Sequence, residues 1–218
     1  SFGKIKEWAD STSQSYLYTD RNTELAKEKQ KKLTKALENL QWLIENNDVI
    51  LKINPQKAYL GRISSTTSIR NNSLINFKKL YWSKGILSHD DVLFFSFQII
   101  NKFPFVLNVL NTKFPYIFID EFQDSNPIQV EIFRKLGNLD SKIGIIGDVA
   151  QSIYEFQGAD YTQFQTFSLP EMNEYILNEN HRSSNEIINI LNSIRTDITQ
   201  VNIRNISIAK PIIFVGDM

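Results

Sequence analysis

Residues Tyr116 to Asp124 read Tyr-Ile-Phe-Ile-Asp-Glu-Phe-Gln-Asp, and this stretch decides the fold class. Four apolar residues run directly into three carboxylates, Asp120, Glu121 and Asp124. In a doubly wound α/β sheet, strands present reactive groups at their carboxyl ends, where adjacent acids can hold a magnesium ion and position a water. A strand that ends in a solvated acidic turn has a similar sequence, so the rest of the chain must decide between the two interpretations.

The pattern of an apolar stretch followed by polar groups recurs twice downstream. Ile143 to Gly147 leads into Asp148 to Ala159, and Tyr175 to Asn178 leads into Glu179 to Ser184. Strands in series with helices between them are typical of a parallel sheet. The strands at 116–119 and 143–146 show no polar alternation, which predicts that both faces of the sheet are covered.

Helices are predicted between and before these strands. Asn126 and Pro127 favour a helix start, and Gly137 favours its end. The other predicted helices are an amphipathic one from about Thr23 to Glu45, one that Ser88 caps ahead of Asp90 and Asp91, a short one near Phe105 to Asn111, and one through about Ile194 that opens with a capping box of Ser183 and Glu186. The chain is therefore expected to have a helical first third and an α/β remainder.

The early turns of the amphipathic helix carry a cluster of lysines. They are Lys27, Lys29, Lys31, Lys32 and Lys35. Such a cluster can contact phosphates, or it can form the solvated face of a helix, and the sequence leaves both interpretations open.

In order, spacing and intervening strands, residues from about Ser88 to Arg195 closely resemble the UvrD/Rep/PcrA-type DNA helicases of superfamily 1, at their second, third and fourth motifs. The resemblance implies an α/β fold that forms part of a RecA-like P-loop NTPase parallel sheet, with a helical 1B-type insertion. Residues 1–85 are then expected to be the helical 1B-like subdomain or part of it. Residues 86–218 are expected to be the second half of RecA-like domain 1A, with the C-terminal end leading toward domain 2A.

The same resemblance implies roles for individual side chains in ATP hydrolysis with Mg²⁺. Asp120 is expected at the magnesium site, and Glu121 is expected to activate the attacking water. Gln151 is expected to contact the terminal phosphate and the water, and Arg182 to stabilise charge on that phosphate. Supporting roles are implied for Gln123 and Asp124.

Contacts with DNA are implied for two aromatic residues of the third motif, Tyr154 and Phe156, on which bases can stack without sequence preference. Both residues can instead belong to a hydrophobic core, and Phe156 is the favoured stacking residue of the two. The chain departs from the family pattern in two places, with Gln157 where arginine is usual and His181 where tyrosine is usual. Imidazole offers less stacking area than tyrosine, so the expected contact between His181 and the adenine base is weakened.

The phosphate loop, Gly-x-x-x-x-Gly-Lys-Ser/Thr, does not occur in the 218 residues. The nearest match, Gly3-Lys4-Ile5, lacks both the first glycine and the hydroxyl residue. We therefore expect an internal portion of a longer helicase, which on its own hydrolyses ATP weakly or not at all.

The composition limits the classes of partner. Lys plus Arg equals Asp plus Glu at 24 each, so any contact with nucleic acid must be local. The chain has no cysteine, no apolar run of roughly 18 residues that would span a membrane and no signal-peptide pattern, which predicts a cytoplasmic protein with no membrane partner.

Three functional classes remain after this reading of the sequence. The first is a segment of an ATP-dependent, 3′ to 5′ DNA helicase or translocase that acts on single-stranded or partly duplex DNA. The second is a DNA- or protein-binding module derived from a helicase that does not hydrolyse ATP, with its protein partner unknown. The third is a metal nuclease built on Asp120, Glu121 and Asp124, which would leave the third and fourth motifs without a role.

Overall fold

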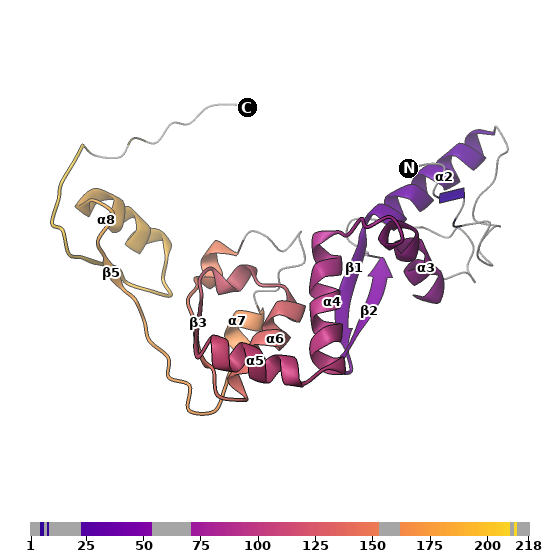
Figure 1. The fold of residues 1–218 in the computed structure, drawn as a ribbon. Helices are drawn as coiled ribbons and strands as arrows, with labels where there is room; N and C mark the ends of the chain where they lie inside the picture. The colour runs from indigo at the N-terminus through magenta and orange to yellow at the C-terminus, as the bar shows by residue number, and fades with distance from the viewer. Residues whose placement is uncertain are drawn as a thin grey trace. The chain divides into compact units, whose positions relative to one another are not determined.

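The computed structural model describes residues 5–6, 8, 23–53, 71–152, 162–209 and 212 (Figure 1). The chain divides into two compact units, Ser1–Pro170 and Glu171–Met218. Each unit is mixed α/β, with helices beside small sheets of two strands. The predicted α/β class is therefore confirmed.

The first unit begins with helix α2 (Glu24–Glu38) and an antiparallel hairpin of strands β1 (Leu40–Glu45) and β2 (Asp48–Ile53). The prediction of one helix from Thr23 to Glu45 is wrong beyond Glu38. Asn46 and Asn47 have φ angles of 52° and 63°, which suit a tight hairpin turn whose twist matches that of the strands. Leu40 and Trp42 are buried on one face of β1, so alternation replaces the helical period there.

The predicted lysine cluster lies on α2, and glutamates of the same helix pair with two of its members. Lys27 Nζ lies 3.1 Å from Glu24 Oε1, and Lys32 Nζ lies 2.6 Å from Glu28 Oε1. The hydrogen bond from Lys32, followed by its charge, lowers the pKa of Glu28. The charge on this helix is thus mixed, which favours the solvated-face interpretation over a phosphate-binding patch.

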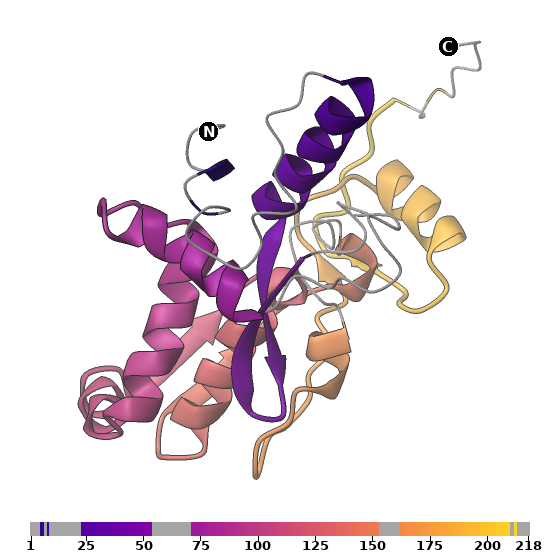
Figure 2. The same cartoon turned by 90° about the vertical axis from the view of Figure 1, so that its right-hand side faces the viewer.

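A hydrophobic core joins the hairpin to helices α3 (Asn71–Trp82) and α4 (His89–Lys102), and the hairpin lies alongside α4 (Figures 1 and 2). At its centre the ring of Trp42 stacks on Phe94, with centroids 3.8 Å apart. Buried Asp91 accepts hydrogen bonds from Trp42 Nε1 at 2.9 Å and Ser88 N at 3.0 Å, and it forms an ion pair with Lys78 Nζ at 2.9 Å. Asp91 therefore ties together β1, α3 and the predicted Ser88 cap of α4, which is confirmed.

The carboxyl end of the first unit holds the parallel strands β3 (Tyr116–Ile119) and β4 (Lys142–Ile145). Helix α5 (Phe105–Lys113) precedes β3, and helix α6 (Pro127–Gly137) connects the strands. Asn126 caps α6 as predicted, by accepting a hydrogen bond from Ile128 N at 2.8 Å. The remaining elements of this unit are the 3-10 turns η2 (Phe122–Asp124) and η3 (Val149–Gln151) and the short helix α7 (Thr162–Thr166).

Among the described residues of this unit, only one face of the β3–β4 pair is covered. On that face Ile119, Ile143 and Ile145 pack against a cluster of Phe122, Val130 and Phe167. On the other face Tyr116 is 68% exposed and Phe118 is 74% exposed. The prediction that both faces of β3 are buried is therefore wrong for the described residues, although the parallel pairing is confirmed.

The second unit contains a short parallel pair, β5 (Glu179–Asn180) and β6 (Val201–Asn202), and helix α8 (Asn185–Ile194). The predicted strand at 175–178 is displaced to β5, and Tyr175 is 82% exposed. The predicted capping box does not form, because Ser184 is the N-cap of α8 and Glu186 Oε2 instead accepts a hydrogen bond from Ile208 N at 3.0 Å. This hydrogen bond is the main reason that the pKa of Glu186 is lowered.

Among the described residues, no single helix is long and apolar enough to cross a membrane. Helices α4 and α5 together reach that length and composition, but the chain bends by 109° between them.

Substitution Asp91→Asn tests the role of Asp91 in the core. Burial alone would raise the pKa of this carboxyl, but hydrogen bonds from Ser88, Trp42 and Lys78 outweigh burial and hold it at about 2. Asp91→Asn leaves the Lys78 charge without its partner, so we expect unfolding to be easier by about 3 kcal/mol in urea titrations at neutral pH. The exposed control Asp140→Asn should change stability by less than about 0.5 kcal/mol.

The same carboxylate predicts a loss of stability in acid. Because its folded pKa lies below its unfolded pKa, its contribution is complete above the unfolded value and disappears as pH falls through about 4 to about 2. The stability difference between the wild type and Asp91→Asn should therefore shrink by about 2 kcal/mol over this pH range. An unchanged difference would contradict the assignment.

Candidate active site

The acidic turn after β3 has a fixed backbone. Asp120 Oδ1 accepts a hydrogen bond from Glu121 N at 2.9 Å. Glu121 has φ 51° and ψ 41°, a left-handed conformation that is uncommon for a residue other than glycine and that clusters at functional sites. The next residue, Phe122, is completely buried in the cluster beneath the sheet and holds η2 in place.

Gln123 connects this turn to the end of β4. Its side chain is completely buried, and both ends of its amide are hydrogen-bonded. Nε2 donates to Glu121 Oε2 at 2.7 Å, and Oε1 accepts from Asp148 N at 3.0 Å. Since a carboxylate can only accept and a backbone N–H can only donate, these partners fix the orientation of the amide.

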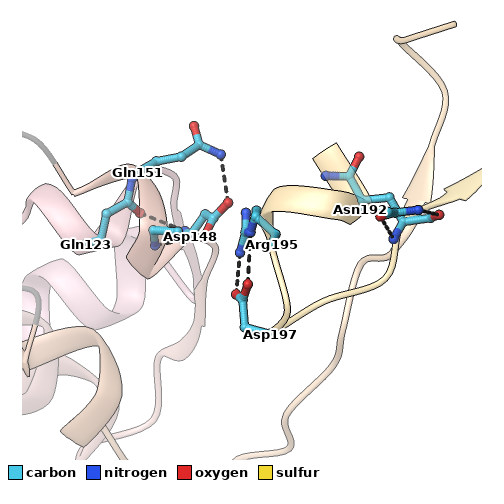
Figure 3. Close-up of polar contacts among 8 residues, drawn as sticks. Gln123, Asp148, Gln151, Asn192, Arg195 and Asp197 are labelled. Atoms are coloured by element: carbon cyan, nitrogen blue, oxygen red, sulfur yellow. Dashed lines mark hydrogen bonds and ion pairs between the residues drawn. The ribbon is translucent and has the colours of Figure 1, made fainter. Parts of the chain in front are cut away.

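Asp148 extends the connection to Gln151. It is the N-cap of η3, where Oδ1 accepts from Ala150 N at 3.0 Å and Oδ2 accepts from Gln151 Nε2 at 2.8 Å (Figure 3). Asp148 is not among the site residues predicted from the sequence. An aspartate that follows a strand and precedes a turn is a typical N-cap, which is the signal that could have identified it.

The two strand ends are also joined through the backbone. Ile146 N donates to Ile119 O at 2.8 Å, and Phe122 N donates to Ile146 O at 2.9 Å. Gly147 lies so close to the amide that a Cβ atom there would be 2.4 Å from Gln123 Oε1. The structure therefore brings three predicted site residues, Glu121, Gln123 and Gln151, into one hydrogen-bonded chain through Asp148.

Magnesium binding can be tested against the donor set. The described residues contain no group of three or more His, Cys, Asp or Glu side chains that could hold a metal ion. Magnesium in nucleotide enzymes commonly takes one or two carboxylates together with the phosphates of the substrate. Asp120 at the exposed strand end fits this requirement. Asp124 lies in the same turn, and its buried Oδ1 accepts no hydrogen bond from the described residues.

The remaining predicted site residues lie elsewhere. Arg182 and His181 belong to the second unit, where Asn180 Oδ1 shapes their turn by accepting hydrogen bonds from Arg182 N at 2.9 Å and Ser183 N at 2.8 Å. His181 Nε2 lies 3.2 Å from Glu179 Oε2. Tyr154 and Phe156 lie outside the described residues.

The second unit has its own polar framework around the end of α8. Arg195 forms a two-pronged ion pair with Asp197, with Nε to Oδ1 at 3.1 Å and Nη2 to Oδ2 at 2.5 Å. This ion pair lowers the pKa of Asp197, chiefly through the hydrogen bond from Arg195. Asn192 and Gln200 exchange two hydrogen bonds, Nδ2 to Gln200 O at 3.0 Å and Gln200 N to Oδ1 at 2.8 Å (Figure 3).

Comparison with known families places the chain in a class. Residues 3–170 match the family described as the UvrD/REP helicase N-terminal domain. The match covers most of the chain and extends to the segment before Ser88, where the motifs that carried the resemblance do not reach. The chain belongs to the UvrD/REP helicase family, and the predicted resemblance is confirmed.

Individual relatives are similar over shorter stretches. The RecBCD enzyme subunit RecB of Buchnera aphidicola subsp. Baizongia pistaciae is 38% identical over 105 residues, which cover 48% of this chain and 9% of RecB. The ATP-dependent DNA helicase PcrA of Staphylococcus aureus is 34% identical over 110 residues, 50% of this chain and 15% of PcrA. The Gabija protein GajB of Bacillus cereus is 34% identical over 144 residues, 62% of this chain and 20% of GajB. The chain thus spans at most a fifth of these relatives.

Substitution Gly147→Ala tests how tightly the amide of Gln123 is held. The new methyl group would overlap Gln123 Oε1 and lie 3.3 Å from Phe122 N, so we expect a loss of about 1–3 kcal/mol and a changed NMR resonance of the Gln123 side-chain amide. Gly137→Ala is the matched control, because its methyl group would overlap Leu169 Cδ1 at 2.4 Å instead. It should leave that resonance in place. Equal effects of both variants on the resonance would contradict the assignment.

Proposed function

We propose that the chain is a segment of the ATPase core of an ATP-dependent DNA helicase or translocase, which moves 3′ to 5′ on single-stranded DNA. The observation that carries the proposal is the hydrogen-bonded chain from Glu121 through Gln123 and Asp148 to Gln151. It joins the two strand ends that a water-activating carboxylate and a phosphate-contacting amide would occupy. Family membership and the similarity to PcrA support the same conclusion.

ATP and Mg²⁺, when bound, would supply the reacting phosphate and the positive charge at this site. Three carboxylates within five residues repel a triphosphate, so a cation on Asp120 is needed to bring the anion close. Among the described residues, Glu121 accepts a hydrogen bond at Oε2, and its Oε1 remains available to take a proton from water. Gln151 donates one N–H to Asp148, and within the described part of the chain its Oε1 and second N–H are left for the water and the phosphate.

Two residues of the second unit, Arg182 and His181, carry the remaining proposed nucleotide contacts. In the proposal Arg182 neutralises the terminal phosphate, and His181 contacts the adenine base. The turn that presents them is held by Asn180, whose Nδ2 donates to Gln200 Oε1 at 2.6 Å while its Oδ1 accepts from the backbone. Tyr154 and Phe156 are the proposed stacking residues for DNA.

Domain assignments follow from the same proposal. Residues 86–218 represent the second half of RecA-like domain 1A, with the end leading toward domain 2A, and residues 1–85 represent the 1B-like subdomain or part of it. The hairpin β1–β2 means that this subdomain is mixed rather than all-helical. The core around Asp91 packs the subdomain against α4.

The 218 residues contain no Gly-x-x-x-x-Gly-Lys-Ser/Thr motif. The second candidate function is a non-hydrolysing module, derived from a helicase, that binds DNA or a protein. Measurement of single-stranded DNA binding by the 218-residue chain, over a series of salt concentrations, tests this alternative. Tight binding without any ATPase from the whole gene product would favour the module.

Substitution Glu121→Gln in the complete product of the gene tests the proposed hydrolysis. Wild-type protein should hydrolyse ATP faster when single-stranded DNA is added. Glu121→Gln removes the proton acceptor and keeps the hydrogen bond with Gln123, so we expect DNA-stimulated kcat to fall by about 100-fold or more. Exposed Glu174→Gln, which makes the same chemical change at a residue with no proposed role, should leave kcat unchanged. Full activity of Glu121→Gln would overturn the proposed role.

A further inference from the structure

The buried amide of Gln123 is positioned to do more than support the fold. A buried amide must find partners for its donor and its acceptor, and this one finds both in the two segments that form the site. One end holds the carboxylate of Glu121, and the other holds the backbone at Asp148, whose carboxylate in turn holds Gln151. Any rotation of the amide would break both contacts together.

We infer that Gln123 is a positioning residue that sets the Glu121 carboxylate and the Gln151 amide in one fixed relation across the two strand ends. The role rests on the proposed function, because ATP hydrolysis is the reaction that requires the Glu121 carboxylate and the Gln151 amide to keep a fixed relative position. In the proposed reaction Gln123 contacts neither the attacking water nor the terminal phosphate. It acts through Glu121 and Asp148.

The packing around the Gln123 amide explains how the Glu121 carboxylate and the Gln151 amide keep their relative position. Phe122 anchors the residue before Gln123 in the hydrophobic cluster, and Gly147 closes against Oε1 with no room for a side chain. Two direct hydrogen bonds, at 2.7 Å and 3.0 Å, therefore act on a completely buried side chain. On the Glu121 side the contact involves Oε2, which directs the carboxylate and leaves Oε1 for the water.

Exchange of the hydrogen-bond donor and acceptor between Gln123 and Glu121 tests the positioning role through thermal stability alone, with no measurement of activity. Gln123→Glu keeps the acceptor for Asp148 N but places a carboxylate oxygen against Glu121 Oε2, so we expect the Tm of the 218-residue chain to fall by about 5–10 °C. Adding Glu121→Gln restores a donor on the opposite side. The double variant should recover to within about 2 °C of Glu121→Gln alone.

Gln129→Glu is the matched control for this swap. Gln129 Oε1 accepts a hydrogen bond from Asn126 N at 2.9 Å, and a glutamate can accept the same bond, so its Tm should stay unchanged. If Gln123→Glu does not fold, recovery of a folded double variant supports the inference. A double variant no more stable than Gln123→Glu, or a pair that both fail to fold, overturns it.

The catalytic side of the role is tested in the complete gene product with Gln123→Met, which keeps the length of the side chain and removes both hydrogen bonds. We expect kcat to fall about 10-fold or more while KM for ATP changes less than about threefold. A purely structural role predicts instead a loss that follows the folded fraction of the protein. If the wild type itself lacks ATPase activity, the proposed function fails, and the Tm swap still decides whether Gln123 couples the two strand ends.

Discussion

The need of a buried amide to satisfy both its donor and its acceptor governs the candidate site. Gln123 has no access to water, so its Nε2 and Oε1 must find partners within the protein. Those partners are Glu121 and Asp148, which lie 27 residues apart in the chain and follow two different strands. The hydrogen bonds therefore convert two neighbouring strand ends into one site, and the positions of the Glu121 carboxylate and the Gln151 amide depend on them.

The first unit has two hydrophobic cores, a small one at the site and a larger one around the β1–β2 hairpin. The small cluster of Phe122, Val130 and Phe167 fixes the turn that carries Gln123. The larger core joins the β1–β2 hairpin to α3 and α4, with Asp91 at its polar centre. A buried carboxylate with three hydrogen-bond donors is stabilised as the charged form, so this core depends on polar as well as apolar contacts. Helix α6 packs beside α4 and also connects β3 to β4, so it links both cores.

Much of the site could be predicted from sequence, because its signals are local. A strand followed by acids, a cap followed by proline at α6, and the Ser88 cap of α4 depend on residues a few positions apart, and the structure confirms the strand, the parallel pairing and both caps. The family resemblance is confirmed over most of the chain. Asp148 had a local N-cap signal that was not used, but its backbone contact with Gln123 joins residues that are distant in sequence and could not be predicted.

The errors have physical reasons as well. Leu33, Leu37, Leu40 and Ile44 fit a helical period, yet the turn at Asn46 and Asn47 and pairing with β2 place Leu40 to Glu45 in a strand. An apolar run such as Tyr116 to Ile119 indicates a strand but does not say which residues cover each face, so the exposure of Tyr116 and Phe118 was not foreseen. The predicted Ser183–Glu186 capping box does not form, because the backbone N–H of Ile208, a residue distant in sequence, donates a hydrogen bond to the Glu186 carboxylate.

Hydrogen exchange of a single backbone amide, Asp148 N–H, measured by NMR in the wild-type chain, tests the central claim most directly. This amide donates to the buried Gln123 Oε1, so its exchange should require opening of the site and should be slow, with an opening free energy near that of β4 amides. The amide of exposed Asn173 provides the reference for fast exchange. Exchange of Asp148 N–H as fast as that of Asn173 would contradict the account, because Gln123 would then not join the two strand ends.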